Sequence, residues 1–292
     1  MESLNFLLSV FLMGLLPVVP GGAPDIVMID DMPLSPPVIA SRKAFPSKSL
    51  SHALSASGVV ILDIRSGQAI FARNEDRKRP IGSLTKIMTA IIIAESHKLD
   101  EIVAIPSDIS DTDGSTASLP PGSHFTVGDI LSALLIASAN DAAETLARFH
   151  SGSSAAFVYA MNERAKSLGL KNTSFANSSG LDDAAQWSTP RNIAWLALYA
   201  LRNPALRSRM STAKASISSV EGHEIKLEHT HALIGKDGAV VAGKTGTTAL
   251  ARQCLLSLVS ENGREYLVVL LGSNERYADL RAILRILRSF LV

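Results

Sequence analysis

The strongest constraint on the fold is a change in the period of the apolar residues along the chain. Residues 58–64 and 69–72 predict two strands, because apolar side chains dominate both and a turn at Arg65-Ser66-Gly67 separates them. The following stretch, to about residue 201, has the period of helices, and from Ala213 the period changes to two. We therefore predict an α/β (α+β) fold: an antiparallel sheet of about five strands flanked by helices, with a helical subdomain inserted between its early and late strands.

Local signals place the individual elements. A helix is predicted to begin at Ser83, and others to cover residues 130–135, 142–149, 155–168, 193–201 and 277–291. Late strands are predicted at residues 215–220, 224–228, 239–242, 253–259 and 266–271, with an Asn262-Gly263 hairpin between the last two. The polar loop 171–185 between helices is long enough to suggest a function.

Length and charge exclude some classes of protein. With 292 residues and 47% hydrophobic content, the chain can bury a large core in one domain that carries extensions. The formal net charge of +1 gives no electrostatic case for a nucleic-acid partner. Cys254 is the single cysteine, which excludes an intrachain disulfide, and its apolar neighbours predict a buried structural thiol.

The N-terminal segment has the layout of a targeting sequence. Residues 6–19 are mostly apolar and small residues follow them, so residues 1–23 are interpreted as a cleaved secretory signal. No Lys or Arg precedes the apolar stretch, and a retained N-terminal anchor or a buried helix stays open as an alternative. Residues 24–55 are a predicted Pro/Ser-rich linker and residues 56–292 the folded domain. The expected location is the periplasm or cell surface, with possible membrane association through this segment.

A serine and a lysine three residues apart open the first predicted helix. At this spacing the side chains of Ser83 and Lys86 share one helical face. A hydroxyl becomes a strong nucleophile when a base lies within hydrogen-bond reach, and a lysine can be that base if burial or nearby cations lower its pKa. A helix cap beside a solvated lysine is the plain alternative, and Ser211 with Lys214 has the same spacing. The assignment therefore depends on partners elsewhere in the chain.

Two further motifs provide such partners. Ser138-Ala139-Asn140 lies at a predicted junction between helices, where a hydroxyl and an amide can project from a fixed loop. Lys244-Thr245-Gly246-Thr247 lies at the predicted end of a strand. Lys244 can keep a nearby lysine neutral by repulsion, and Gly246 lets a substrate backbone approach. The motifs S-x-x-K, S-x-N and K-T-G occur in this order, as they do in penicillin-binding proteins.

From about Ser57 to Val292 the chain resembles low-molecular-mass penicillin-binding proteins of the D-alanyl-D-alanine carboxypeptidase type. The likeness rests on the three motifs, on residues 79–89, on residues 161–162 with 172–175, and on Ser179-Gly180-Leu181-Asp182. It implies a β-lactamase/transpeptidase-like fold and a serine peptidase acting on peptidoglycan, in which residues 56–292 form the catalytic domain.

The resemblance also implies a role for each motif residue. Ser83 would attack the carbonyl between two D-alanines and form an acyl-enzyme, and Lys86 would take its proton. Ser138 would relay a proton to the leaving amine, Asn140 would hold Lys86 and the substrate amide, and Lys244 would supply positive potential.

Substrate binding would use the strand that carries Lys244. The backbone N–H groups of Ser83 and Thr247 would form the oxyanion hole, a feature whose single donors are worth roughly 3 kcal/mol in other hydrolases. Thr245 and Thr247 would meet the terminal carboxylate, and Gly246 would leave room for the peptide. The implied partners are peptidoglycan stem peptides and, as covalent inhibitors, β-lactam antibiotics; no metal or cofactor is implied.

Some positions depart from the family pattern. Thr230 lies where Arg in some relatives helps to bind carboxylate, which puts that help in doubt. Asn192 and Trp187 also differ from common family residues. Many relatives continue into a second β domain, so the shorter chain is nearer to the D,D-endopeptidase branch, whereas Ser138-Ala139-Asn140 looks like the carboxypeptidase form. We therefore expect a D-Ala-D-Ala carboxypeptidase, with a cross-link endopeptidase as the second reading.

Three other readings are weaker. A class A β-lactamase needs a carboxylate in an E-x-x-L-N segment, and residues 171–185 contain only Asp182 and Asp183 as acidic residues. A metallopeptidase could use His229 and His231, but H-E-x-x-H is absent, and these histidines are interpreted as polar residues of a partly exposed strand. An inactive penicillin-binding scaffold would have damaged motifs, and here all three are intact.

Overall fold

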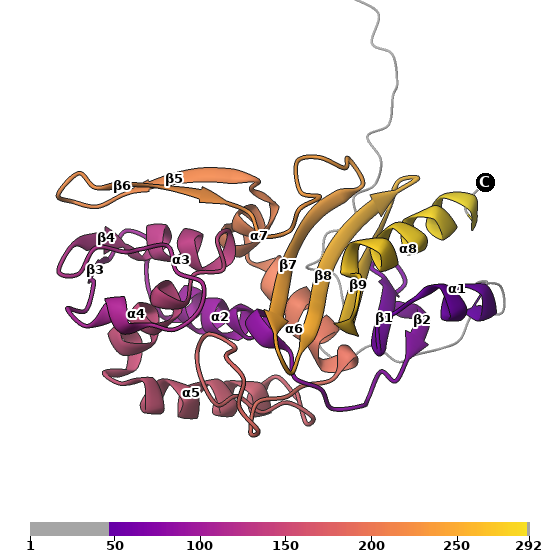
Figure 1. Cartoon of the computed structure of the whole chain (residues 1–292), viewed down its shortest axis with the longest axis horizontal. Coiled ribbons are helices and arrows are strands. Elements are labelled where there is room, and N and C mark those ends of the chain that lie inside the picture. Colours follow the sequence, from indigo (N-terminus) through magenta and orange to yellow (C-terminus); the bar gives the residue numbers. More distant parts are fainter. Residues whose placement is uncertain (1–46, 291–292) are drawn as a thin grey trace, which may run out of the picture.

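A five-stranded antiparallel sheet organises one half of the molecule (Figure 1), as predicted. The structure is a computed structural model, and it describes residues 47–290. The strand order is β2-β1-β9-β8-β7. The strands are β1 (Gly58–Asp63), β2 (Gln68–Arg73), β7 (Val240–Thr248), β8 (Arg252–Glu261) and β9 (Arg264–Ser273). Because β1 pairs with β9, the first and last parts of the domain are joined within one sheet.

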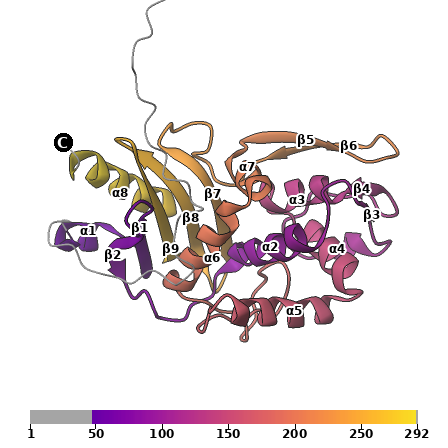
Figure 2. The same ribbon diagram turned by 180° about the vertical axis from the view of Figure 1, so that it is seen from behind.

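Successive side chains of a strand point to opposite faces of the sheet. Both faces of this sheet are apolar, and helices cover both. On one face, side chains such as Val59 and Val268 pack with helix α8 (Arg276–Phe290) in one apolar cluster. On the other face, neighbours such as Val60 and Val269 pack with helix α6 (Pro190–Arg202) in the main core. Figures 1 and 2 show α8 and α6 on opposite sides of the sheet.

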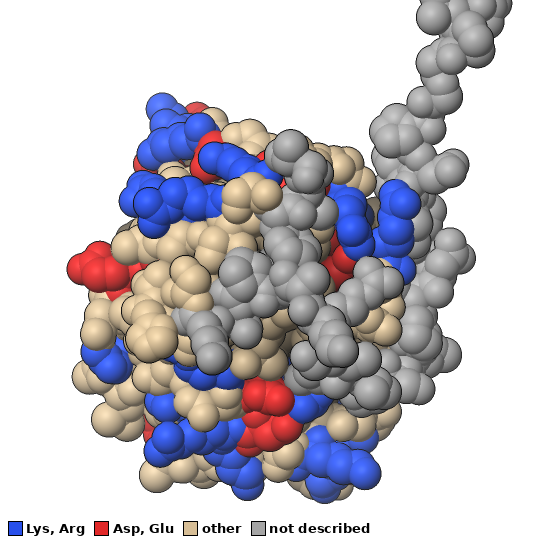
Figure 3. Space-filling view, turned by 90° about the vertical axis from the view of Figure 1, so that its right-hand side faces the viewer, with Lys and Arg blue, Asp and Glu red and all other residues tan. Residues whose placement is uncertain are grey.

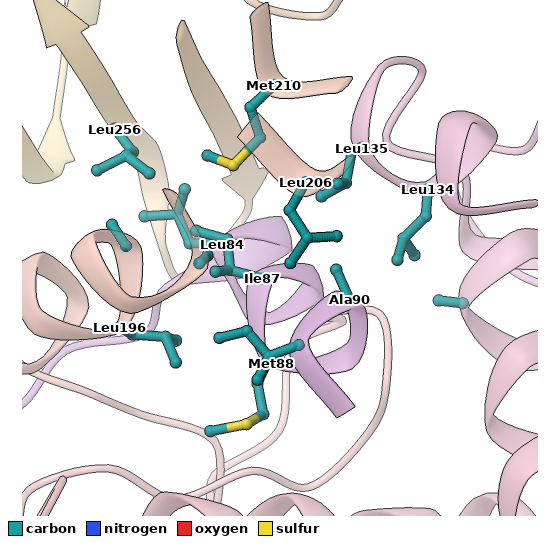
Figure 4. Packing of buried hydrophobic residues seen from close by; sticks show 14 of the residues in the cluster. Leu84, Ile87, Met88, Ala90, Leu134, Leu135, Leu196, Leu206, Met210 and Leu256 are labelled. Carbon is teal, nitrogen blue, oxygen red and sulfur yellow. The ribbon is translucent and has the colours of Figure 1, made fainter. Parts of the chain in front are cut away.

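The helical subdomain surrounds α2 (Lys86–Ser96). The other helices are α3 (Val127–Leu135), α4 (Asn140–Ser151), α5 (Ser154–Ser167) and α7 (Pro204–Ser211), and the 3-10 helices η2 (Gly82–Thr85) and η3 (Ile109–Asp111) lie in the loops. The first eight residues of α2 are all buried. Figure 4 shows Ile87 and Met88 of α2 among apolar side chains from α3, α6, α7 and β8. A helix that is apolar on every side is stable only in such an interior.

Local capping signals fix where several helices begin. Thr126 and Asp129 form a capping box at α3, with Thr126 Oγ1 accepting from the Asp129 N–H at 3.0 Å. Thr189 caps α6 in the same way, and Pro190 follows at the first helical position. These side-chain caps therefore set where α3 and α6 begin.

The structure corrects two expectations about β-structure. The predicted strands near residues 215–220 and 224–228 exist as β5 (Lys214–Ser218) and β6 (Glu224–Glu228), but they form a separate two-stranded sheet. Within these two strands only Ile217 and Leu227 are buried, and both pack on the helical core, so the hairpin covers that core instead of extending the main sheet. The strands β3 (Ile102–Ala104) and β4 (His124–Thr126) were not predicted, because each has three residues and only its middle one is buried.

Helix α1 (Ser47–Ala53) lies within the range that the sequence indicated as a linker without helical periodicity. Leu50 and Leu54 pack into the same apolar cluster as α8. Asp279 of α8 accepts hydrogen bonds from the Ser55 and Ala56 N–H groups at 2.8 and 2.9 Å, which fixes the segment that follows α1. The expected signal or anchor at residues 1–23 lies outside the described residues. No helix within residues 47–290 is long and apolar enough to cross a membrane.

The end of the molecule near α1 and α8 carries charges of both signs. Figure 3 shows its basic side chains in several separate groups, with acidic side chains among them. Pairs such as Arg288 with Glu261, 2.7 Å apart, account for part of this mixture.

Candidate active site

The three sequence motifs meet where the edge strand β7 contacts η2 and the start of α2. Ser83 lies in η2, and Lys86 is the first residue of α2. Gly82 has φ +53°, a left-handed conformation that favours glycine and turns the chain sharply just before Ser83. The serine is thus presented at the junction between the sheet and the helical subdomain.

Lys86 is fully buried, and its amine contacts three oxygen atoms. Nζ lies 3.1 Å from Ser83 Oγ, 2.6 Å from Asn140 Oδ1 and 2.6 Å from the carbonyl oxygen of Ser179. The amide and carbonyl oxygens can only accept hydrogen bonds, whereas the hydroxyl can also donate. A neutral amine has two hydrogens and one lone pair, which satisfies this arrangement completely when the lone pair faces Ser83.

The surroundings of Lys86 favour that neutral form. Burial is the main cause that lowers the pKa of Lys86 well below its ordinary value, and repulsion by Lys244 lowers it further. The Asp141 carboxylate acts in the opposite direction with a smaller effect. The geometry and the electrostatics therefore both make Lys86 able to accept a proton from Ser83.

Lys244 and Ser138 form a second buried pair beside the first. Lys244 Nζ donates to Ser138 Oγ at 2.6 Å and to the Thr245 carbonyl oxygen at 3.1 Å. Burial, followed by repulsion from Arg276, lowers the pKa of Lys244 to about 7. Ser138 has φ +60° between α3 and α4, an uncommon conformation for a residue other than glycine that aims the hydroxyl at Lys244. A hydroxyl that accepts from a lysine keeps its own hydrogen free for another acceptor.

Asn140 links Lys86 to the loop before β4. Its Nδ2 donates to the Asp113 carbonyl oxygen at 2.7 Å, and its backbone N–H donates to Ser115 O at 2.7 Å. The neighbouring Asp141 is buried and accepts from the N–H groups of Ala117 and Leu119. The side-chain oxygen of Asn140 is therefore held toward Lys86 by contacts on its other side.

Glycines allow the backbone of β7 to lie directly against the backbone of Ser83. A Cβ atom on Gly246 would stand 3.0 Å from Ser83 N and 2.6 Å from Ile81 O. A Cβ atom on Gly82 would stand 3.2 Å from Thr247 N. The N–H groups of Ser83 and Thr247, the expected oxyanion donors, thus belong to two segments in close contact. The sequence predicted strand periodicity over residues 239–242 with the K-T-G motif at the strand's end, and β7 continues to Thr248 and includes the whole motif.

Arg276 is a site residue that no local sequence pattern marks. It lies at the start of α8 and donates to the carbonyl oxygens of Gly246 and Cys254 at 3.2 and 3.0 Å, and it also contacts Thr247 Oγ1. Thr230 occupies the position where some relatives have an arginine, and its hydroxyl accepts a hydrogen bond from Thr245 Oγ1 at 2.7 Å. A guanidinium is therefore present beside Thr247, although it comes from a different part of the chain.

The loop at residues 171–185 contributes main-chain oxygens. Besides the contact of Ser179 O with Lys86, Ser178 O accepts from Thr89 Oγ1 at 2.7 Å. The sequence indicated that this loop has a function, but a carbonyl oxygen has no residue-type signature. A cavity of about 260 Å³ opens beside this loop; Asn140 and Ser179 line one part of it, and acidic residues that include Asp111 and Asp113 line another.

His229 and His231 are not on a partly exposed strand, as interpreted from the sequence. Both are buried in the segment between β6 and β7, and His231 Nε2 lies 2.8 Å from Ser257 Oγ. Burial is the main cause that lowers the pKa of His229 to about 3 and that of His231 to about 4. Across residues 47–290, no group of three or more His, Cys, Asp or Glu side chains is arranged to hold a metal ion.

Cys254 and the pair Ser211 and Lys214 lie outside the three motifs of the site. Cys254 is fully buried, as predicted, and burial raises the pKa of its thiol to about 11. Ser211 and Lys214 do not form a pair like that of Ser83 and Lys86. Ser211 Oγ donates to Arg207 O at 2.9 Å, and the exposed Lys214 lies 3.8 Å from Glu228.

Comparison with known proteins gives the same family for sequence and structure. A family profile described as D-alanyl-D-alanine carboxypeptidase matches residues 44–275. The chain is 30% identical over 258 residues to the D-alanyl-D-alanine carboxypeptidase DacF of Bacillus subtilis, covering 86% of this chain and 66% of that protein. It is also 30% identical to the D-alanyl-D-alanine endopeptidase of Pseudomonas aeruginosa, covering 82% of this chain and 78% of that protein.

Solved structures show the corresponding fold. The crystal structure of the Streptomyces K15 DD-transpeptidase superimposes with a TM-score of 0.75 at 27% identity, covering 81% of this chain and 98% of that chain. The match includes the five-stranded antiparallel sheet and its helices, so the predicted transpeptidase-like architecture is confirmed. With the profile spanning most of the chain, this protein belongs to the D-alanyl-D-alanine carboxypeptidase family of serine-type DD-peptidases.

Proposed function

We propose that the protein is a serine D-Ala-D-Ala carboxypeptidase that removes the terminal D-alanine from peptidoglycan stem pentapeptides. One observation carries the proposal: the amine of the fully buried Lys86 lies 3.1 Å from Ser83 Oγ, while its other two contacts are oxygens that only accept hydrogen bonds. This arrangement suits a neutral lysine that acts as the general base for a serine nucleophile.

The first half of the reaction forms an acyl-enzyme. Ser83 Oγ attacks the carbonyl carbon between the two D-alanines, and its proton passes to Lys86 Nζ. The N–H groups of Ser83 and Thr247 stabilise the negative charge on the carbonyl oxygen. The C–N bond then breaks. Ser138, whose Oγ accepts a hydrogen bond from Lys244, gives its hydroxyl proton to the leaving amine and takes up the proton that Lys86 received from Ser83, so Lys86 is neutral again.

The second half returns the enzyme to its starting state. Water attacks the ester carbonyl while Lys86 accepts a proton from that water. Lys86 passes this proton to Ser83 Oγ as the ester bond breaks, so that Ser83 leaves as its hydroxyl, and the shortened peptide is released with a new terminal carboxylate. No metal ion or cofactor takes part in the proposal.

Recognition of the substrate carboxylate depends on the end of the site near α8. Thr245 and Thr247 offer hydroxyl groups, and Arg276, which contacts Thr247, supplies a permanent positive charge. Guanidinium and hydroxyl donors suit a carboxylate. The same features suit β-lactam antibiotics, which carry a carboxylate next to the reactive carbonyl, and we propose that they acylate Ser83.

A D,D-endopeptidase that separates peptidoglycan cross-links is the second candidate. The observation in its favour is the 30% identity to the Pseudomonas aeruginosa endopeptidase, which equals the identity to the Bacillus subtilis carboxypeptidase. In both reactions Ser83 would attack the main-chain carbonyl of a D-alanine residue. The two reactions differ in the amine that leaves.

A β-lactamase activity is not favoured by the loop that faces the site. Asp182 accepts hydrogen bonds from Thr248 and Leu250, and Asp183 accepts from the Ala185 N–H at 2.7 Å. Neither carboxylate is recorded in contact with Ser83 or Lys86. We therefore expect the penicilloyl ester on Ser83 to be long-lived.

Purified protein should be incubated with pentapeptide muropeptides and, separately, with cross-linked dimers, and the products identified by mass spectrometry. Loss of one D-alanine from the pentapeptide supports the carboxypeptidase. Conversion of dimers to monomers supports the endopeptidase. Absence of both products, in protein that a fluorescent penicillin labels, would contradict both candidates.

We also propose a location outside the cytoplasm, in the periplasm or at the cell surface, because that is where such substrates occur. The apolar residues 6–19 support this proposal as a secretory signal or anchor. Residues 56–292 would then act as the catalytic domain, with α1 packed onto it. Detection of the full chain only in a cytoplasmic fraction would contradict this location.

A further inference from the structure

The loop that contains Ser179 packs against the backbone of the nucleophile. Gly180 has φ +95°, and a Cβ atom there would stand 2.1 Å from Gly82 O and 2.8 Å from Ser83 N. The preceding residue, Ser179, presents its carbonyl oxygen to Lys86 at 2.6 Å. A displacement of this loop would therefore alter both the position of Ser83 and the surroundings of Lys86.

Asp182 connects this loop to the opposite wall of the site. Its carboxylate accepts from Thr248 Oγ1 at 2.5 Å and from the Leu250 N–H at 3.0 Å. Thr248 Oγ1 also accepts from the Ala251 N–H at 3.0 Å, so its single hydrogen is free for Asp182. Both partners belong to the end of β7 and the turn into β8, directly after Thr247, whose N–H is an expected oxyanion donor.

The loop at residues 179–182 and the strand end at residues 246–250 are thus linked in two ways. Gly180 and Gly246 each pack against the backbone around Ser83. The carboxylate of Asp182 also bonds directly to Thr248 and Leu250. We infer that Asp182 is a positioning residue for acylation, which holds the Ser179 carbonyl on Lys86 and the Thr247 N–H beside Ser83 at the same time.

This inference rests on the proposed function, because it assigns a role relative to Ser83 and Lys86. The exposed carboxylate of Asp182 would control the surroundings of the buried Lys86 amine through the loop that carries Ser179. Without Asp182 the loop loses two hydrogen bonds to the β7–β8 turn, and water gains access to Lys86. Desolvation is the main cause of the lowered pKa of Lys86, so partial hydration would raise that pKa toward its ordinary value.

The test compares Asp182→Ala with Asp183→Ala in the full chain. Asp183 is the adjacent exposed carboxylate, and its side chain bonds only within its own loop, to the Ala185 N–H. The rate constant for acylation by a fluorescent penicillin is measured from pH 5 to 10, together with thermal unfolding. We expect Asp182→Ala to slow acylation by roughly tenfold, the factor for one hydrogen bond to a charged group, and to move the acid limb of the profile to higher pH.

Two further variants separate positioning from general loss of structure. Asp182→Asn keeps an acceptor for the Leu250 N–H and should recover part of the rate. Thr248→Val removes the hydroxyl partner, and combining it with Asp182→Ala should cost less than the product of the two single effects, because both remove the same contact. An acid limb that shifts in Asp182→Ala but not in Asp183→Ala supports the inference.

The inference is overturned if Asp182→Ala acylates with the wild-type rate and pH profile. It is also overturned if its rate loss comes with an unchanged acid limb, or if the two substitutions combine without coupling. Failure of the proposed function looks different, because the wild-type protein would then take up no penicillin on Ser83.

Discussion

Lys86 Nζ lies 3.1 Å from Ser83 Oγ, and the lysine side chain is fully buried at this position. Burial alone would leave an ammonium poorly solvated, and Lys244 adds a second positive charge to the same interior. The neutral amine avoids both costs and can accept the serine proton. The relationship between these two residues therefore connects the stability of the site to its chemistry.

Replacement of Lys86 should remove the general base without removing the nucleophile. We expect Lys86→Gln to lower the acylation rate by about 10²- to 10⁴-fold, the usual contribution of a general base. The acid limb of the pH profile should disappear, because it reflects protonation of Lys86. Stopped-flow or gel-based kinetics with a fluorescent penicillin measure both effects.

Lys214→Gln is the matched control, since Ser211 and Lys214 have the same spacing in the sequence. Its rate and profile should equal those of the wild type. An unchanged acid limb in Lys86→Gln would mean that another group is the base.

Arg276→Gln should affect substrate binding and the alkaline limb together. The guanidinium contacts Thr247 and is the second cause, after burial, of the lowered pKa of Lys244. A neighbouring cation disfavours a charged lysine, so its removal raises the pKa of Lys244 above about 7 and moves the alkaline limb to higher pH. KM for a D-Ala-D-Ala peptide should rise roughly tenfold or more, because a hydrogen bond to a charged carboxylate is lost.

Steady-state kinetics from pH 6 to 10 measure both consequences of the Arg276 change. Arg281→Gln, an exposed arginine on the same helix, serves as the control and should change neither value. A normal KM in Arg276→Gln would exclude the guanidinium from carboxylate binding.

Gly246→Ala should disturb the oxyanion hole by steric contact. The added methyl group would stand 2.6 Å from Ile81 O and 3.0 Å from Ser83 N, so β7 must move away from η2. Loss of one oxyanion donor costs about 10²- to 10³-fold in other hydrolases, and we expect an acylation defect that approaches this range. Gly238→Ala is the control, because a Cβ atom there meets nothing within 4 Å.

In free energy, Gly246→Ala should change the stability measured by thermal unfolding less than it changes the barrier to acylation. If Gly246→Ala and Gly238→Ala acylate equally well, the close approach of the two backbones has no role in catalysis.

The three motifs were predictable because each combines specific residue types at a fixed spacing. Ser83 with Lys86, Ser138 with Asn140, and Lys244 with Gly246 could therefore be found, and the structure brings them together. The change in the period of the apolar residues along the chain also indicated the inserted helical subdomain.

The features that the sequence did not reveal depend on long-range contacts. Arg276 belongs to the site only because α8 packs on the sheet beside β7, and nothing in its local sequence marks it. The Ser179 contact uses a backbone oxygen, which every residue possesses. Periodicity gives the face that a strand buries but not its partner strand, so β5 and β6 were expected in the main sheet. The short helix α1 was hidden by its Pro- and Ser-rich surroundings.

His229 and His231 should make stability depend on pH in the acid range. Burial lowers their pKa values to about 3 and about 4, below the ordinary value of 6.5. Below pH 6.5 these histidines bind protons in the unfolded chain but stay neutral in the folded protein, so the free energy of unfolding falls as the pH falls. The slope is about 1.4 kcal/mol per pH unit for each histidine until its folded pKa is reached.

Denaturant unfolding between pH 4 and 7 measures this slope. The variant His229→Asn/His231→Asn should have a flatter dependence, because asparagine does not titrate. Equal slopes for this variant and the wild type would contradict the assigned protonation states.

Tryptic mass spectrometry of the protein after incubation with penicillin tests most directly whether Ser83 is the nucleophile of a serine DD-peptidase. We predict the penicilloyl mass on the peptide of residues 79–86, its absence in Ser83→Ala, and its persistence in Ser211→Ala. A penicilloyl group on any other serine, or equal labelling of Ser83→Ala, would contradict this assignment.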